Sequence, residues 1–351
     1  MPDANLDNVR IGLLGSGFVA NFYMEGLANV NHQTVVSNWS RSLETAGSFA
    51  EKWGIPEPTD DIDSFIGRDD IDLYMVGVPN HVHLEYGLKL IEAGRAQVMT
   101  KPLARNAKEA KQLLDAAESA GVFNGYAETE VFAPAVVQAE QMIRDGALGR
   151  LTWVRSREAH SGPHSPHFWD PELTGGGALN DMGCHCIEAA RYFFGKDDKV
   201  VKVMAYGDLL VHKDKTKAED NAILVMIFES GGIGHCELSW TTQGGLDLRN
   251  EVFGTEGTIF TDVCRATPLL AFTKGGAGYL VEKADAETGW VRPVPEEAFT
   301  YGYQGEMKHF VDCLRLGKKP REDFLDGYIV NIILDAGYES MKSGKWVKVS
   351  Y

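Results

Sequence analysis

The sequence contains few cysteines, few positive charges and no long hydrophobic run. An odd number of cysteines is scattered through the second half of its 351 residues, at Cys184, Cys186, Cys236, Cys264 and Cys313. This pattern is typical of free thiols in a reducing compartment rather than of a disulfide framework. The short polar N-terminus has no secretory pattern, so we expect a cytoplasmic protein.

The shortage of positive charge excludes some classes of partner. Lys and Arg number 34 against 50 Asp and Glu, which gives a formal net charge of −16. Such a chain is not expected to bind nucleic acid or an anionic membrane surface. In addition, no apolar run reaches membrane-spanning length. From the charge and the hydropathy together, we expect neither nucleic acid nor a membrane among its partners.

A glycine-rich turn near the N-terminus predicts a dinucleotide site. An apolar stretch at 9–14 is followed by G-S-G-F-V-A at 15–20, which opens a helical pattern. In this strand–turn–helix context the first glycine permits a tight turn, and the second lets the backbone approach a pyrophosphate at the helix N-terminus. A glycine turn in another α/β fold is the alternative. The residues predicted to bind the cofactor here are Gly15, Ser16, Gly17, Phe18 and Val19.

The end of the second strand pattern bears on the choice between NADP and NAD. NAD-binding proteins usually carry an acidic residue there for the ribose hydroxyls. This chain has Ser40-Arg41-Ser42 after the strand pattern at 34–39. An arginine suits a 2′-phosphate, which it can hold through paired hydrogen bonds. We therefore expect Ser40 and Arg41 to bind the cofactor and to favour NADP, with NAD as the alternative if Arg41 stacks on adenine or faces solvent.

The predicted fold class is α/β with two domains. Strand and helix patterns alternate through 1–126, which predicts a Rossmann domain with a doubly wound parallel sheet. Residues 127–351 contain longer alternating stretches, which predict a substrate-binding and oligomerisation α/β domain with a large, open, mostly antiparallel sheet. Two final helices, near 303–316 and 325–342, belong to this second range but could pack back on the first domain.

Polar residues follow two strand patterns of the first domain. Pro79, Asn80 and His83 come after 72–78, and Lys101 comes after 96–99. In doubly wound sheets ligands lie beyond the carboxyl ends of the strands. We therefore predict Pro79, Asn80 and His83 near the nicotinamide, and Lys101 near the cofactor and a substrate hydroxyl. For His83, a structural hydrogen bond at a helix start is the alternative.

A second glycine-rich turn, at 175–177, leads into a helical pattern that carries Asp181 and His185. A spacing of four residues places both side chains on one helix face. A carboxylate beside an imidazole can act as a general-base pair, because the carboxylate fixes the ring tautomer and favours the imidazolium. The alternative is a helix cap and a packed surface ring.

With these motifs in place, the chain resembles the Gfo/Idh/MocA oxidoreductases, NAD(P)-dependent enzymes that act mainly on sugars and cyclitols. The resemblance spans nearly the whole chain and rests on the first glycine turn, Thr100-Lys101-Pro102, 175–185 and the tail 320–345. It implies a Rossmann domain, a C-terminal domain with an open sheet, and a homodimer or homotetramer paired through that sheet's outer face. Thr100 stands where the family usually has Glu.

The resemblance implies that Lys101, Asp181 and His185 are catalytic. The expected reaction is hydride transfer between a nicotinamide cofactor and a secondary hydroxyl or ketone of a sugar, glycoside or cyclitol. His185 would take the hydroxyl proton, Asp181 would orient the reacting groups, and Lys101 would hydrogen-bond the reacting oxygen. Two alternatives are an NAD-dependent glycosidase that oxidises C3 transiently, and a non-catalytic NADP-binding sensor.

The loop before the second glycine turn is rich in histidine, proline and tryptophan. Aromatic faces pack on sugar C–H surfaces, while His and Arg donate hydrogen bonds to hydroxyls or an anionic substituent. Proline residues at 163 and 166 prevent a fixed helical ligand spacing, so we predict no metal site from these histidines. The residues expected to contact substrate, besides the catalytic three, are Arg157, His160, His164 and Trp169.

Overall fold

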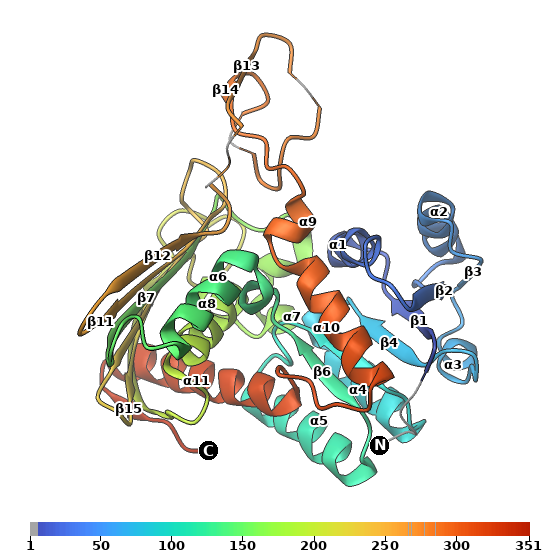
Figure 1. The fold of residues 1–351 in the computed structure, drawn as a ribbon, viewed down its shortest axis with the longest axis horizontal. Coiled ribbons are helices and arrows are strands. Elements are labelled where there is room, and N and C mark those ends of the chain that lie inside the picture. Colours follow the sequence, from blue (N-terminus) through green and yellow to red (C-terminus); the bar gives the residue numbers. More distant parts are fainter. Residues whose placement is uncertain (1–5, 266, 268, 277, 285) are drawn as a thin grey trace. The chain divides into compact units, whose positions relative to one another are not determined.

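The computed structural model describes residues 6–351 except 266, 268, 277 and 285 (Figure 1). Internal contacts divide the chain into two compact units. The first unit comprises the chain up to residue 128 together with 303–328, and the second comprises 129–302 and 329–351. The first part of the tail, including helix α10 (Tyr303–Arg315), is thus part of the N-terminal unit.

The sheet of the first unit has the strand order β3-β2-β1-β4-β5-β6, and all of its neighbouring strands are parallel. The predicted doubly wound parallel sheet is therefore confirmed. Its central strands are completely buried, as expected for a parallel sheet covered on both faces. The strands are β1 (Val9–Leu14), β2 (Gln33–Trp39), β3 (Glu57–Thr59), β4 (Leu73–Val76), β5 (Gln97–Thr100) and β6 (Asn124–Ala127).

Three helices of the first unit begin at a residue whose side chain caps the helix. Ser42, Asp61 and Asn106 each accept backbone N–H groups at the start of α2, α3 and α5. Helix α10 packs on α1, where the ring of Tyr303 stacks on that of Phe22 at 4.6 Å between centroids. The remaining bounds are α1 (Phe18–Leu27), α2 (Leu43–Trp53), α3 (Ile62–Ile66), η1 (Asn80–Val82), α4 (His83–Glu92) and α5 (Ala107–Ala120).

The second unit contains a sheet with the order β12-β11-β7-β10-β9-β8-β15. Strands β7 and β10 are parallel and the other neighbours are antiparallel, which confirms the prediction of a large, mostly antiparallel sheet. The strands are β7 (Leu151–Ala159), β8 (Val200–Asp208), β9 (Asn221–Phe228), β10 (Ile233–Ser239), β11 (Asp247–Gly254), β12 (Thr258–Asp262) and β15 (Val347–Lys348). A separate two-stranded ribbon joins β13 (Ala271–Thr273) and β14 (Gly289–Val291).

One face of this sheet carries helix α8 (Ala178–Phe194), which packs against β7, β10 and β9 (Figure 1). Residues of β9 alternate between buried and more exposed positions, so every second side chain points towards that helix. Among the described residues, no helix is both long and apolar enough to cross a membrane. The other helices are η2 (Thr129–Phe132), α6 (Pro134–Arg144), η3 (Pro166–Trp169), α7 (Pro171–Thr174), α9 (Glu297–Thr300) and α11 (Phe324–Ser343).

Candidate functional site

The first glycine of the N-terminal turn is required by the fold itself. Gly15 has φ +115°, a conformation that side chains rarely adopt, and its N–H donates to the Trp39 carbonyl at 2.9 Å. A Cβ atom at this position would lie 2.4 Å from the carbonyl oxygen of Gly77. Only glycine therefore allows β1 and β4 to be followed by this tight turn.

The second glycine, Gly17, is not required by the backbone conformation or by packing. Gly17 has an ordinary φ of −87°, and no described atom lies within 4 Å of the place where its Cβ would be. It immediately precedes α1, whose start carries no side-chain cap. There is thus open space beside Gly17 at the uncapped start of α1, and a helix N-terminus is a common place for a phosphate to bind. These residues fit the pyrophosphate of a dinucleotide.

Ser40, Arg41 and Ser42 have three different surroundings. The buried Ser40 hydroxyl lies 2.5 Å from that of Ser16, which ties the end of β2 to the glycine turn. Ser42 caps α2 by accepting the N–H of Thr45. Arg41 is exposed and makes no hydrogen bond or ion pair with any residue that the structure describes. Of the three, Arg41 is the one with its charge open to a ligand.

His83 is completely buried between the ends of two strands. Its Nε2 lies 2.8 Å from the Val78 carbonyl oxygen, and its Nδ1 lies 3.0 Å from that of Pro102. Burial lowers the pKa of the imidazole, against the opposing effect of these backbone hydrogen bonds. The geometry gives His83 a structural role in joining the two loops. Its direct contact with a cofactor stays a prediction, as does that of Pro79 and the buried Asn80.

Lys101 follows β5 and is half-buried next to a buried phenol. Burial raises the pKa of Tyr23, and the nearby Glu306 carboxylate raises it further, whereas Thr100 and Lys101 act in the opposite direction. Glu306 is itself completely buried on α10. The Tyr23 phenol therefore lies in the electrostatic field of both Glu306 and Lys101. Thr100 stands where the resemblance leads one to expect an acidic residue before this lysine.

In the second unit, the triple glycine lies close to two residues that are distant in sequence. A Cβ on Gly176 would lie 1.9 Å from the Tyr338 hydroxyl, and one on Gly177 would lie 2.1 Å from the Glu219 carbonyl oxygen. The Glu219 carboxylate accepts the Leu179 N–H and the Tyr338 hydroxyl, both at 2.9 Å. This buried carboxylate thus caps α8 and fixes where Asp181 lies along it.

Asp181 lies in the first turn of α8 and is buried. Its Oδ2 accepts a hydrogen bond from Nε1 of Trp240 at 3.1 Å. Trp240 is completely buried and follows β10. The indole therefore holds the carboxylate in one orientation, a role for Trp240 that the sequence analysis did not predict.

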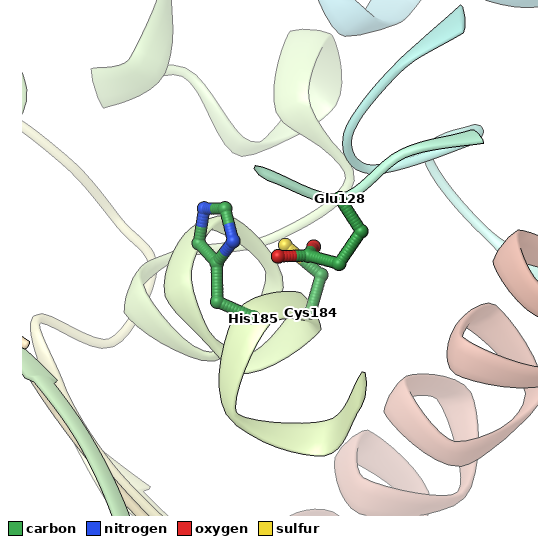
Figure 2. A group of neighbouring side chains, drawn as sticks. All are labelled: Glu128, Cys184 and His185. Carbon is green, nitrogen blue, oxygen red and sulfur yellow. The ribbon is translucent and has the colours of Figure 1, made fainter. Parts of the chain in front are cut away.

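His185 lies one helical turn beyond Asp181, with 13 % of its side chain exposed. Its Nε2 lies 3.9 Å from Oε2 of Glu158 on β7. Figure 2 shows His185 and Cys184, which are neighbours on α8. A second carboxylate, Glu158, thus lies near the imidazole, and no local pattern indicated it because β7 and α8 are far apart in sequence.

The loop residues expected to contact substrate are distributed over different surroundings. Trp169 is half-buried and packs edge-to-face on Trp240, with 5.4 Å between ring centroids, and His212 packs on it at 4.9 Å. His160 is buried, and its Nδ1 accepts the Gly162 N–H. His164 is about half exposed, with its Nε2 3.8 Å from Glu282. Trp169 is therefore linked through Trp240 to Asp181.

Arg157 does not join this group. It alternates with Glu158 along β7, so it lies on the opposite face of the sheet. There it forms ion pairs with Asp247, at 2.9 Å, and with Glu237. Its predicted contact with substrate is untested, but within the second unit its charge is already compensated on the face that does not carry α8.

Comparison with known families covers both units. A family model described as the oxidoreductase family with an NAD-binding Rossmann fold matches residues 9–126. A second, described as the GFO/IDH/MocA C-terminal domain, matches residues 136–260.

Individual relatives are similar over nearly their full length. Levoglucosan dehydrogenase of Pseudarthrobacter phenanthrenivorans is 27 % identical, covering 98 % of this chain and 99 % of the relative. The NAD⁺-dependent scyllo-inositol 2-dehydrogenase of Bacillus subtilis is 25 % identical, with 97 % and 96 % covered. Among solved structures, GenD2 from gentamicin A biosynthesis, in complex with NAD, is 28 % identical and superposes with a TM-score of 0.92 over 100 % of this chain and 99 % of its own.

Proposed function

The chain belongs to the Gfo/Idh/MocA family of oxidoreductases, and on this basis we propose that it is a dehydrogenase or reductase acting on a secondary hydroxyl or ketone of a sugar, glycoside or cyclitol. Relatives named for levoglucosan and scyllo-inositol support this substrate class. A nicotinamide cofactor, when bound, supplies or accepts the hydride. The glycine turn and the start of α1 hold its phosphates.

The reacting groups divide between proton transfer and orientation. His185 takes the proton of the substrate hydroxyl, or returns it in the direction of reduction. Asp181, fixed by Trp240, orients the reacting oxygen. Lys101 donates a hydrogen bond to the same oxygen as it becomes a carbonyl. The half-buried Trp169 packs on the C–H surface of the ring.

The observation that carries this proposal is the composition of α8. Almost every residue of the helix is buried, yet it keeps a carboxylate at Asp181 and an imidazole at His185. Burying polar groups costs free energy unless they are compensated, so a helix that only packed against the sheet would be expected to carry apolar residues there. A proton-transfer role accounts for both.

The test is substitution of the proton-transfer residues with cofactor binding measured separately. Lys101→Ala and His185→Ala are each expected to lower turnover of the best substrate by about 10²-fold or more. The dissociation constant of the cofactor, measured by fluorescence, is expected to stay within about threefold for His185→Ala. Unchanged turnover in both variants would refute the assignment.

The same family membership underlies a proposed homodimer or homotetramer that pairs through the outer face of the second unit's sheet. That face exposes apolar side chains, among them Tyr206 (66 %), Ile223 (43 %) and Phe260 (70 %). Apolar surface of this kind on a sheet face marks an interaction site. Light scattering is expected to give an oligomer for the wild type and a smaller species for Ile223→Lys. A wild-type monomer would exclude this pairing.

A further inference from the structure

The proposed reaction requires His185 to accept a proton inside a largely buried environment. An imidazole whose side chain is 13 % exposed gains a charge when it does so. Burial disfavours the charged form of histidine and therefore weakens it as a base. A nearby carboxylate offsets this cost and also fixes the orientation of the ring. The question is which carboxylate provides this.

The Asp181 carboxylate already accepts a hydrogen bond from a buried side chain. Its Oδ2 accepts the indole N–H of Trp240, and a carboxylate that accepts a hydrogen bond has part of its charge compensated by that donor. Trp240 cannot follow a moving carboxylate, because its ring is completely buried and its carbonyl accepts Nε2–H of His212 at 3.0 Å. Asp181 is thus anchored towards the tryptophan.

Glu158 approaches the imidazole from the sheet. Its Oε2 lies 3.9 Å from Nε2 of His185, and its side chain is only 11 % exposed. This distance exceeds that of a hydrogen bond, so the interaction is electrostatic and strengthens when the ring becomes charged. A protonated His185 places an opposite charge near this buried carboxylate.

Other charged or titratable groups surround this part of α8. Glu130 on η2 accepts a hydrogen bond from the Asn250 amide at its Oε1, at 2.8 Å. Glu188 forms an ion pair with Arg191 on the same helix. On the exposed side of α6, Glu140 pairs with Arg144. The groups on α8 and on the elements packed against it include Glu130, Glu140, Arg144, Glu158, His160, Asp181, Cys184, Cys186, Glu188, Arg191 and Cys236.

Glu158 lies on the face of β7 that carries α8, because it alternates along the strand with Arg157 on the other face. Burial raises the pKa of the Cys186 thiol, and Cys236, Glu130 and Glu158 raise it further. Of these carboxylates, that of Glu158 lies 3.9 Å from His185 Nε2. A carboxylate in this position favours a proton on the imidazole.

We propose that Glu158 is a positioning residue, which orients the His185 imidazole from β7 and stabilises its protonated form. The division of roles then differs from a simple Asp–His pair on one helix. Asp181 is held by Trp240 for orientation of the substrate oxygen, and Glu158 provides the counter-charge for the base. This inference rests on the proposed function for its catalytic meaning, but the coupling between Glu158 and His185 can be measured without any substrate.

The experiment is an NMR titration of the His185 ring in the full-length protein. Glu158→Gln, which keeps the side chain's shape, is expected to lower the pKa of His185 by about one unit. Glu158→Asp, which keeps the charge, is expected to retain most of the wild-type value. Glu140→Gln is the control, because it removes a carboxylate already paired with Arg144, and it is expected to leave the His185 titration unchanged.

Two further results distinguish a failure of the Glu158 proposal from a failure of the proposed function. If a substrate is found, the acidic limb of kcat/KM for oxidation is expected to move to lower pH by about one unit in Glu158→Gln, with a plateau about tenfold lower. An unchanged His185 titration in this variant overturns the role of Glu158, whatever the activity. A shifted titration in a protein that oxidises no sugar or cyclitol upholds the coupling and refutes the proposed function.

A reciprocal measurement tests the Glu158–His185 coupling without the Glu158→Gln variant. If Glu158→Gln does not fold, the reciprocal measurement uses His185→Asn with the Glu158 carboxyl observed by carbon NMR. Coupling is mutual, so loss of the imidazolium is expected to raise the pKa of Glu158. An identical Glu158 titration in wild type and His185→Asn contradicts the proposal.

Discussion

The indole Nε1 of Trp240 donates a hydrogen bond to Oδ2 of Asp181 at 3.1 Å, and both side chains are buried. This contact joins the residue after β10 to the first turn of α8. Because Trp169 packs edge-to-face on Trp240, the same indole links the carboxylate to the loop expected to bind substrate. The position of Asp181 therefore depends on an aromatic residue remote from it in sequence.

Replacement of Trp240 by Phe is expected to destabilise the protein and slow the reaction. The buried carboxylate loses a charge-assisted hydrogen bond, which costs about 2 kcal/mol in the free energy of unfolding. A misoriented Asp181 is expected to lower turnover about tenfold. The comparison is a double-mutant cycle with Asp181→Asn. Strict additivity of the two substitutions would show that the contact contributes no coupling.

The two glycines of the N-terminal turn are expected to fail in different ways when changed to alanine. Gly15→Ala places a Cβ 2.4 Å from a backbone oxygen at φ +115°, so unfolding is expected to become easier by about 2 kcal/mol or more. Gly17→Ala meets no atom within 4 Å and is expected to leave stability nearly unchanged.

Although Gly17→Ala is expected to leave stability nearly unchanged, it is expected to weaken cofactor binding. A methyl group there occupies the space that the phosphates would enter, so the dissociation constant is expected to rise about tenfold or more. Thermal unfolding and cofactor titration of the two variants distinguish these effects. Wild-type cofactor affinity in Gly17→Ala would contradict the proposed phosphate position.

The elements that sequence periodicity predicted best are those whose own residues determine them. The strand at 9–14 followed by the glycine turn contains both the apolar run and the required glycines, and β1 covers the same residues. The three-residue β3, which includes Pro58, is too short to give a pattern.

Only those residues of the candidate site that belong to a local sequence motif could be predicted. Asp181 and His185 were visible as a pair because helical spacing brings them to one face. Trp240, Glu158 and Glu219 reach α8 from other elements, so their roles depend on tertiary packing that no local pattern contains. Alternation along β7 could have placed Arg157 and Glu158 on opposite faces, but not shown which face carries α8.

Protonation of His83 is expected to make stability depend on pH. Burial lowers the pKa of this imidazole in the folded protein, so the unfolded chain binds the proton more readily. The stabilisation is present above the unfolded value of about 6.5 and is lost as the pH falls below it. The slope contributed is at most about 1.4 kcal/mol per pH unit.

The measurement is urea unfolding of the wild type and of His83→Gln between about pH 5 and neutrality. The wild type is expected to lose stability more steeply below about pH 6.5 than the variant does. Taking the difference between the two removes the contribution of His235, whose pKa burial also lowers. Parallel curves would mean that His83 does not titrate differently on folding.

Arg41 is expected to set the cofactor preference. Its guanidinium is exposed and makes no ion pair within the described part of the chain, so it is available for a 2′-phosphate. Arg41→Ala is expected to lower kcat/KM with NADP about tenfold and to change that with NAD little. Equal losses with both cofactors would indicate stacking on the adenine instead. Relatives solved with NAD or NADH make this a direct comparison.

The most direct test of the central claim is the stoichiometry of cofactor reduction. Purified protein is mixed with free sugars, cyclitols and aryl glycosides, with NAD and NADP separately, and reduced nicotinamide is followed alongside aglycone release. The account predicts one reduced cofactor for each molecule of a sugar or cyclitol oxidised. Aglycone release without net cofactor reduction would contradict it and would identify a redox glycosidase.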